Sequence, residues 1–256
     1  MSAREALVLK GLTMHFGGLR AVDGVDLAIR EGEIASLIGP NGAGKTTIFN
    51  CVTGQYHPTA GSVTLFGKTR LDGRPPHAVS KLGVVRTFQN IRLFPAMTAL
   101  ENVMVGRHCQ TRAGVFGALL KGPRVVREER AIRDKARELL AFVDLSKHEA
   151  SLARNIPYGE QRRLEIARAL AAEPRVLCLD EPAAGMNPNE SGALMDLIAR
   201  IRESGITIFL IEHHMNVVMG ISDTVHVLDH GVKIAEGKPA GVQKDKAVIA
   251  AYLGEG

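Results

Sequence analysis

The residues that most directly suggest chemistry form one glycine-rich loop, Gly39-Pro40-Asn41-Gly42-Ala43-Gly44-Lys45-Thr46, which is followed by Thr47. Its glycines let successive backbone N–H groups approach one anion where side chains would block access. Lys45 adds a mobile positive charge, and the hydroxyl of Thr46 can bind the magnesium ion that accompanies a nucleotide. The segment from Gly39 to Thr47 is therefore predicted to cradle the phosphates of a nucleotide.

Other polar residues follow short apolar runs that read as buried strands. Asp180 and Glu181 come directly after the run 176–179, and Glu212, His213 and His214 come after the run 206–211. The carboxyl ends of parallel strands form the edge at which open α/β sheets bind ligands. The two carboxylates are thus expected at a ligand-binding edge.

Gln89 and Phe16 have no role that their positions alone establish. Gln89 lies just past a strand predicted at Val84-Val85, where a polar residue is usually a solvated loop side chain. Phe16 precedes the turn Gly17-Gly18, where its ring either stacks on an adenine or fills the core. The residues alone leave both alternatives open.

The surrounding elements are predicted from periodicity and caps. Residues 7–12 and 25–29 alternate as half-buried antiparallel strands do, and residues 33–38 form a buried strand before the phosphate loop. The helix at 47–52 directs its positive dipole end at the same phosphates. Further strands are expected at 62–66, 84–85, 176–179 and 206–211, with a hairpin at 224–235 and a last helix at 243–253.

The composition changes near Pro95. Thr98-Ala99-Leu100-Glu101 is a capping box that opens a helix, and further helices are expected at 124–143 and 161–172. Residues 106–122 between them are small and weakly periodic. Basic residues outnumber acidic ones between 121 and 137, which indicates a solvated helix face or a face toward lipid or another subunit.

Length and composition set wider bounds. The chain has 256 residues, 45% of them apolar, which suits one large domain or two interleaved ones. No run of about 20 apolar residues exists, and the first residues lack an apolar signal core, so a cytosolic chain is expected. The net charge of +5 suits anionic lipid or nucleic acid, whereas 4% aromatics without Trp disfavour base stacking. Cys51, Cys109 and Cys178 are expected to be reduced and unpaired.

Taken in order, these residues resemble the ATP-binding subunits of ABC transporters, from about Leu7 to Gly237. The resemblance rests on the phosphate loop and on six further motifs, which are Phe16 as the A-loop aromatic, the Q-loop 87–89, a signature segment 156–170, Asp180-Glu181-Pro182 as Walker B, a D-loop 184–187, and His213 as switch histidine. It implies an α/β fold: a RecA-like P-loop NTPase core with an N-terminal antiparallel β subdomain and an inserted α-helical subdomain.

The resemblance also implies domain boundaries and roles. Residues 5–94 would hold the β subdomain and the first part of the core, 95–172 the helical subdomain, 173–240 the rest of the core, and 241–256 a C-terminal helix. ATP and Mg²⁺ would be the cofactors, with the metal held by Thr46, Gln89 and Asp180. Glu181 would be the general base, and His213 and Gln89 would complete the catalytic site.

Within the family, the stretches Tyr158–Arg168 and Pro182–Pro188 are similar to the subunit of branched-chain amino acid importers. The implied partners are a second ATP-binding subunit, two membrane permease subunits and a periplasmic or extracellular solute-binding protein, with no nucleic acid. The chain would lie at the cytoplasmic face of the inner membrane. Alternatives are amide, urea or lipid cargo, and a soluble ABC ATPase acting on nucleic acid or ribosomes. Neither the solute nor the direction of transport is encoded in this chain.

The signature segment departs from the family pattern. Tyr158, Gly159 and Glu160 are expected to face the ATP of the partner, but Pro157 stands where the family has a serine hydroxyl. Asn187 replaces the D-loop aspartate, and His214 stands where an aspartate is frequent. The loss of the hydroxyl leaves the Gly159 N–H and a helix dipole for the partner's phosphate. An asymmetric pair with a different ATP-binding subunit is therefore expected, although a homodimer is the alternative.

Overall fold

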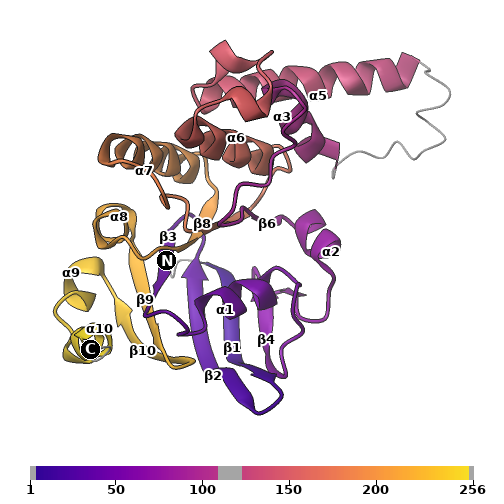
Figure 1. Cartoon of the computed structure of the whole chain (residues 1–256). Helices are drawn as coiled ribbons and strands as arrows, with labels where there is room; N and C mark the ends of the chain where they lie inside the picture. Colours follow the sequence, from indigo (N-terminus) through magenta and orange to yellow (C-terminus); the bar gives the residue numbers. More distant parts are fainter. Residues whose placement is uncertain (1–3, 109–122, 254–256) are drawn as a thin grey trace. The chain divides into compact units, whose positions relative to one another are not determined.

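The computed structural model describes residues 4–108 and 123–253, and the chain divides into two compact units (Figure 1). Residues up to Gln89 and from Arg175 onward form the first unit, and residues 90–174 form the second. Cys109, Lys121 and most of the segment 106–122 lie outside the described residues. The domain boundaries expected from the sequence, after residues 94 and 172, remain a prediction.

The first unit begins with an antiparallel sheet in the order β2-β1-β4-β5. Its strands are β1 (Glu5–Phe16), β2 (Leu19–Arg30), β4 (Ala60–Leu65) and β5 (Thr69–Arg70). Leu7, Leu9 and Leu12 expose at most 1% of their surface to solvent, as expected for strands with one face in the core. The predicted antiparallel β subdomain is confirmed.

A six-stranded sheet follows in the order β10-β9-β3-β8-β7-β6. Its strands are β3 (Ile34–Ile38), β6 (Val84–Arg86), β7 (Val176–Asp180), β8 (Thr207–Ile211), β9 (Thr224–Asp229) and β10 (Val232–Gly237). All neighbours are parallel except β9 and β10, which form the predicted hairpin. Every residue of β3, β7 and β8 is buried, as the unbroken apolar runs required.

Helices cover both faces of this sheet. Helix α1 (Lys45–Val52) contributes Ile48 and Phe49 to a core shared with the antiparallel sheet, where the Phe49 ring is tilted against that of Phe209 with centroids 4.6 Å apart. Helices α8 (Met215–Ile221), α9 (Pro239–Val242) and α10 (Lys246–Leu253) pack on Val225 and Val227 in a second cluster. Helices α2 (Pro76–Lys81) and α7 (Pro188–Glu203) complete the unit. The glycine-rich loop therefore follows a strand of a sheet whose two faces are both covered by other elements.

The second unit is helical. It contains α3 (Ala99–His108), α5 (Pro123–Phe142), α6 (Tyr158–Leu170) and two short 3₁₀ turns at Ser146–His148 and Ala153–Asn155. The predicted capping box opens α3, because the Thr98 hydroxyl accepts from Glu101 N–H and the Glu101 carboxylate accepts from Thr98 N–H. Helix α3 packs against both α5 and α6.

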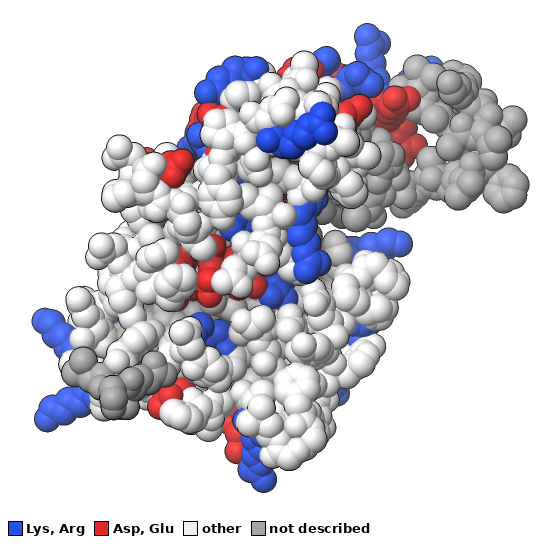
Figure 2. Space-filling model, viewed as in Figure 1, with Lys and Arg blue, Asp and Glu red and all other residues white. Residues whose placement is uncertain are grey.

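The basic residues of α5 form ion pairs with nearby carboxylates. Arg133 lies 3.7 Å from Glu129, Lys135 lies 2.9 Å from Glu138, and Arg137 lies 2.8 Å from Glu149. On the face of the molecule drawn in Figure 2, Lys and Arg side chains are spread among uncharged ones. These contacts agree with the interpretation of a solvated helix face.

The structure differs from the expectations at two helices. The last helix, expected at 243–253, is α10 and begins at Lys246, because the Asp245 carboxylate accepts from Ala247 N–H at 2.8 Å and starts the helix there. Helix α8 was not predicted, since it is short and has no side-chain cap. Among the described residues, none of the helices has both the length and the apolar content needed to cross a bilayer.

Candidate active site

The glycine-rich loop joins β3 to α1, and its backbone fits only where side chains are absent. Gly39 has φ 148°, and a Cβ there would lie 2.1 Å from the carbonyl oxygen of Leu228. Gly44 has φ 100°, and its Cβ would lie 2.5 Å from the carbonyl oxygen of Ala21. These contacts are with backbone, which cannot move aside as a flexible side chain does. The loop is thus an open cradle of main chain at the start of a helix.

Lys45 crosses this cradle. Its side chain is 9% exposed, and Nζ donates hydrogen bonds to the carbonyl oxygens of Gly39 at 2.5 Å and Pro40 at 2.7 Å. The ammonium group therefore lies inside the loop, held by two neutral acceptors. An anion placed in the cradle would meet this charge directly.

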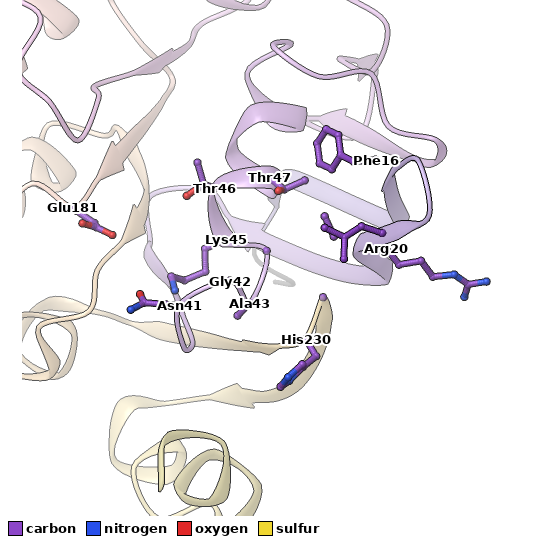
Figure 3. Close-up of a pocket in the computed structure, with 14 residues that line it drawn as sticks. Phe16, Arg20, Asn41, Gly42, Ala43, Lys45, Thr46, Thr47, Glu181 and His230 are labelled. Carbon is purple, nitrogen blue, oxygen red and sulfur yellow. The ribbon is translucent and has the colours of Figure 1, made fainter. Parts of the chain in front are cut away.

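A cavity of about 460 Å³ opens on the loop. It is lined by Phe16, Leu19, Arg20, Ala21, Asn41, Gly42, Ala43, Gly44, Lys45, Thr46, Thr47, Glu181, His230 and Gly231. Figure 3 shows Lys45 and Thr46 near its centre, with Glu181 and Phe16 on opposite sides. Of the residues predicted to bind a nucleotide, only Gly39 and Pro40 are absent from the lining, and their carbonyls hold Lys45. The cavity has the size of a small-molecule site.

Phe16 is exposed to 42% and does not fill the core. Its ring meets the ring of Tyr56 edge-on, with centroids 5.2 Å apart at 75°. This contact holds the Phe16 ring from one side and leaves part of it facing the cavity. An aromatic ring held in this way can stack on a planar base.

Glu181 is placed by an unusual backbone. It has φ 45°, a left-handed conformation that is rare without glycine, and its N–H donates to the Ile211 carbonyl at 2.9 Å. Gln89 Nε2 donates to Glu181 Oε2 at 2.6 Å, and His213 Nδ1 lies 3.5 Å from the same oxygen. Three residues singled out from separate strand ends thus meet around one carboxylate.

Asp180 is buried and paired, which the sequence did not predict. Arg86 Nη2 lies 2.5 Å from Asp180 Oδ2, and its Nη1 donates to Asn50 Oδ1 at 2.6 Å. The guanidinium also lies over the rings of Phe49 and Phe88, at 5.5 Å and 5.3 Å. Both partners of the ion pair are almost fully buried, with side chains 6% and 7% exposed. The sequence offered one signal for this ion pair, which is the single charged residue Arg86 at the end of the short apolar strand β6.

The donors fit a magnesium ion that is bound mainly through a nucleotide. Among the described residues, no group of three or more His, Cys, Asp or Glu side chains could hold a metal by itself. Thr46 lines the cavity, whereas Gln89 and Asp180 are not part of its lining; Asp180 ends β7, and Gln89 follows the neighbouring strand β6. Mg²⁺ commonly takes one or two protein oxygens and completes its shell with phosphate and water.

The signature residues lie in the helical unit, at the start of α6. Pro157 caps the helix without a side-chain bond, Tyr158 is 47% exposed, and Gly159 is buried. The Glu160 carboxylate lies 2.9 Å from Lys147 Nζ and 2.7 Å from His148 Nε2. Burial acts to raise the pKa of Glu160, but the hydrogen bond from Lys147 and the nearby positive charges outweigh it and lower the pKa.

Sequence reasoning missed one wall of the cavity. Leu19, Arg20 and Ala21 come from the start of β2, and His230 and Gly231 come from the turn between β9 and β10. The Gly231 N–H donates to the Ala43 carbonyl at 3.2 Å, which ties this turn to the phosphate loop. No motif marks these residues, since only the fold brings the hairpin turn to the loop.

Comparison with known families and curated proteins gives consistent matches. The family described as "ABC transporter" matches residues 22–184, and the family described as "Branched-chain amino acid ATP-binding cassette transporter" matches residues 232–256. The chain is 50% identical to the high-affinity branched-chain amino acid transport ATP-binding protein LivG of Salmonella typhimurium. It is 48% identical to the protein BraF of Pseudomonas aeruginosa, whose name is otherwise the same. Each comparison covers 99% of both chains.

Solved structures give the same fold. A nucleotide-free ATP-binding cassette from an ABC transporter is 30% identical, with a TM-score of 0.86 over 98% of this chain and 100% of the other. A dimeric post-hydrolysis state of the cassette MJ0796, bound to ADP and Pi, is 26% identical, with a TM-score of 0.76 over 91% and 98%. The predicted α/β fold, with its P-loop core, antiparallel β subdomain and helical subdomain, is confirmed.

Proposed function

The chain belongs to the ABC transporter family, and from this premise we propose that it is the ATP-binding and ATP-hydrolysing subunit of a system that imports branched-chain amino acids. The single observation that carries the proposal is the meeting of Glu181, Gln89 and His213 beside a cradle of glycine backbone. The names of the relatives, and the match of residues 232–256, support the cargo.

The nucleotide would lie along the cavity. The N–H groups of the phosphate loop and Lys45 would bind the β- and γ-phosphates, and the adenine would stack on Phe16. Supporting this, Gly39 and Gly44 cannot carry a Cβ, and Phe16 faces the cavity with its ring held by Tyr56. Asn41, Gly42, Ala43, Thr46 and Thr47 line the same space.

Thr46, Asp180 and Gln89 would hold Mg²⁺, directly or through water. When bound, the ion would neutralise charge on the phosphate oxygens and orient them. For Asp180 to contribute, its carboxylate must share its charge between the ion and Arg86 Nη2. Arg86 would thus keep this carboxylate oriented at the carboxyl end of β7.

Glu181 would act as the general base or orient the attacking water. Its Oε2 accepts a hydrogen bond from Gln89, which leaves the other carboxylate oxygen for water. His213, half exposed beside it, would hold the γ-phosphate and the water in line. Because Gln89 contacts Glu181, a change in the occupancy of this site would move Gln89 and with it the segment that follows, residues 90–97.

Transport requires partners. We infer that a second ATP-binding subunit closes on this one, that Tyr158, Gly159 and Glu160 face the nucleotide of that partner, and that two permease subunits receive the motion. A solute-binding protein outside the membrane would deliver the amino acid, and the chain would be peripheral at the cytoplasmic face. Pro157 favours a different chain as the second subunit, and strong two-site hydrolysis by the homodimer would contradict this.

The test of the hydrolytic role is Glu181→Gln, with Glu203→Gln as the control, since Glu203 is exposed on α7. Glu181→Gln should bind ATP as the wild type does but turn it over about 100-fold more slowly or worse, within the usual span for an acid/base group. Nucleotide affinity and phosphate release would be measured on the same preparations. Wild-type turnover in Glu181→Gln would refute the role, and copurification with permease subunits would test the transport assignment.

A further inference from the structure

The end of β8 carries a buried carboxylate for which the proposed mechanism has no use. Glu212 is fully buried, with 0% of its surface exposed, and it separates the apolar strand from His213. A buried carboxylate is costly unless its oxygens are hydrogen-bonded. Its partners therefore indicate why a charge is kept at this position.

All the backbone partners of Glu212 belong to two loops of the active site. Its Oε1 accepts from the Ala183 N–H at 2.9 Å, two residues after Glu181. Its Oε2 accepts from the N–H groups of His213 at 3.0 Å and His214 at 3.2 Å, and His214 Nδ1 lies 3.3 Å from the same oxygen. One rigid group thus joins the loop after β7 to the loop after β8.

The loop after β7 needs such support, because the backbone of Glu181 is in an unfavourable left-handed conformation. Two bonds hold it on either side of Pro182. One runs from Glu181 N–H to the carbonyl of Ile211, and the other runs from Ala183 N–H to the carboxylate of Glu212. Both acceptors belong to the end of β8, which also starts the loop of His213.

We propose that Glu212 is a positioning residue that sets the distance between Glu181 and His213, and so the rate of ATP hydrolysis, without touching the nucleotide. A neutral side chain at this site could fill the space. It could not accept hydrogen bonds from both loops with two charged oxygens. The inference rests on the roles proposed above for Glu181 and His213.

The experiment replaces Glu212 with glutamine, which keeps the shape but turns one acceptor into an NH₂ donor that must face a backbone N–H. The matched control is Glu33→Gln. Glu33 is also buried, at 8% exposure, and its carboxylate accepts from the Arg30 N–H at 2.7 Å, but the loops of Glu181 and His213 are not among its contacts. Turnover, KM, ATP affinity and thermal unfolding would be measured for both variants.

Glu212→Gln should lower kcat by roughly 10- to 100-fold, the loss typical of a misplacement of about 1 Å, while the Kd for ATP changes by less than about threefold. Glu33→Gln should leave kcat within about twofold of wild type, whatever it does to stability. In a His213→Ala background, the effect of Glu212→Gln should shrink severalfold, because one of its two targets is gone.

Three results would overturn the inference: wild-type kcat in folded Glu212→Gln, equal losses of kcat in Glu33→Gln, or full additivity with His213→Ala. If Glu212→Gln does not fold, Glu212→Asp takes its place. The aspartate keeps the charge but is one methylene too short to reach both loops, so wild-type turnover in that variant would also refute the proposal. Failure of the underlying roles is separate, since it would appear as wild-type turnover in Glu181→Gln.

Discussion

Arg86 offers the sharpest test of how the site is held together. Its guanidinium forms a buried ion pair with Asp180, in which the two side chains are 6% and 7% exposed, and it also bonds to Asn50. Arg86→Met retains an unbranched chain that can still pack between Phe49 and Phe88. The substitution leaves the carboxylate of Asp180 buried without its counter-charge.

The expected cost follows from that burial. Removing one partner of a buried pair costs about 3–5 kcal/mol, because the remaining charge is uncompensated. For a chain of this size, about 1 kcal/mol lowers the unfolding temperature by roughly 2–4 °C, so Arg86→Met should lower it by about 6–20 °C. Thermal unfolding followed by circular dichroism, without nucleotide, measures this directly.

Two controls isolate the cause. Arg70→Met removes a pair of similar geometry, 2.7 Å to Asp72, but Arg70 is exposed, so its unfolding temperature should change by less than about 2 °C. The double variant Arg86→Met with Asp180→Asn should recover a large part of the loss, because the buried charge is then gone. A drop of less than about 2 °C in Arg86→Met, or no recovery in the double variant, would refute the reasoning.

Two further predictions concern stability and binding. Gly39→Ala should abolish ATP binding in titration calorimetry, because the added Cβ would lie 2.1 Å from the Leu228 carbonyl, whereas Gly192→Ala, which meets nothing within 4 Å, should bind normally. Burial lowers the pKa of His226 from 6.5 to about 4 against the opposing charge of Glu236, so the folded state resists its protonation. His226 thus contributes stability above pH 6.5 that is lost as the pH falls toward 4. Between pH 7 and pH 4.5, the free energy of unfolding measured with denaturant should therefore decrease less in His226→Gln than in the wild type.

Much of the local structure was predictable because it depends on neighbouring residues. The apolar run 34–38, the glycines that follow it and the cap at Thr98 all act within a few positions, and the structure has each of them. The start of the C-terminal helix, expected at residue 243, lies at Lys246 for a reason that is also local. Asp245 caps a helix that apolar periodicity alone could not separate from the preceding turn.

The candidate site could be predicted only as a set of strand ends. A parallel sheet places carboxyl ends along one edge, so Asp180 and Glu181 were expected at a ligand-binding edge, whereas the roles of Gln89 and His213 were implied only by the family resemblance. Their pairing was not, because it depends on strand order and side-chain direction. The contacts Gln89–Glu181 and Arg86–Asp180 join residues 92 and 94 positions apart.

By itself, the sequence determined the phosphate loop, the buried strands and the residue types at their ends, since glycine conformation, apolar patterning and capping are local properties of a chain. Only the tertiary structure decided that Arg86 neutralises Asp180, that the hairpin turn at His230 walls the cavity, and that Glu212 joins two loops. A buried charge takes its partners from whatever the packed fold brings within about 3 Å, and that choice is made across the sheet rather than along the chain.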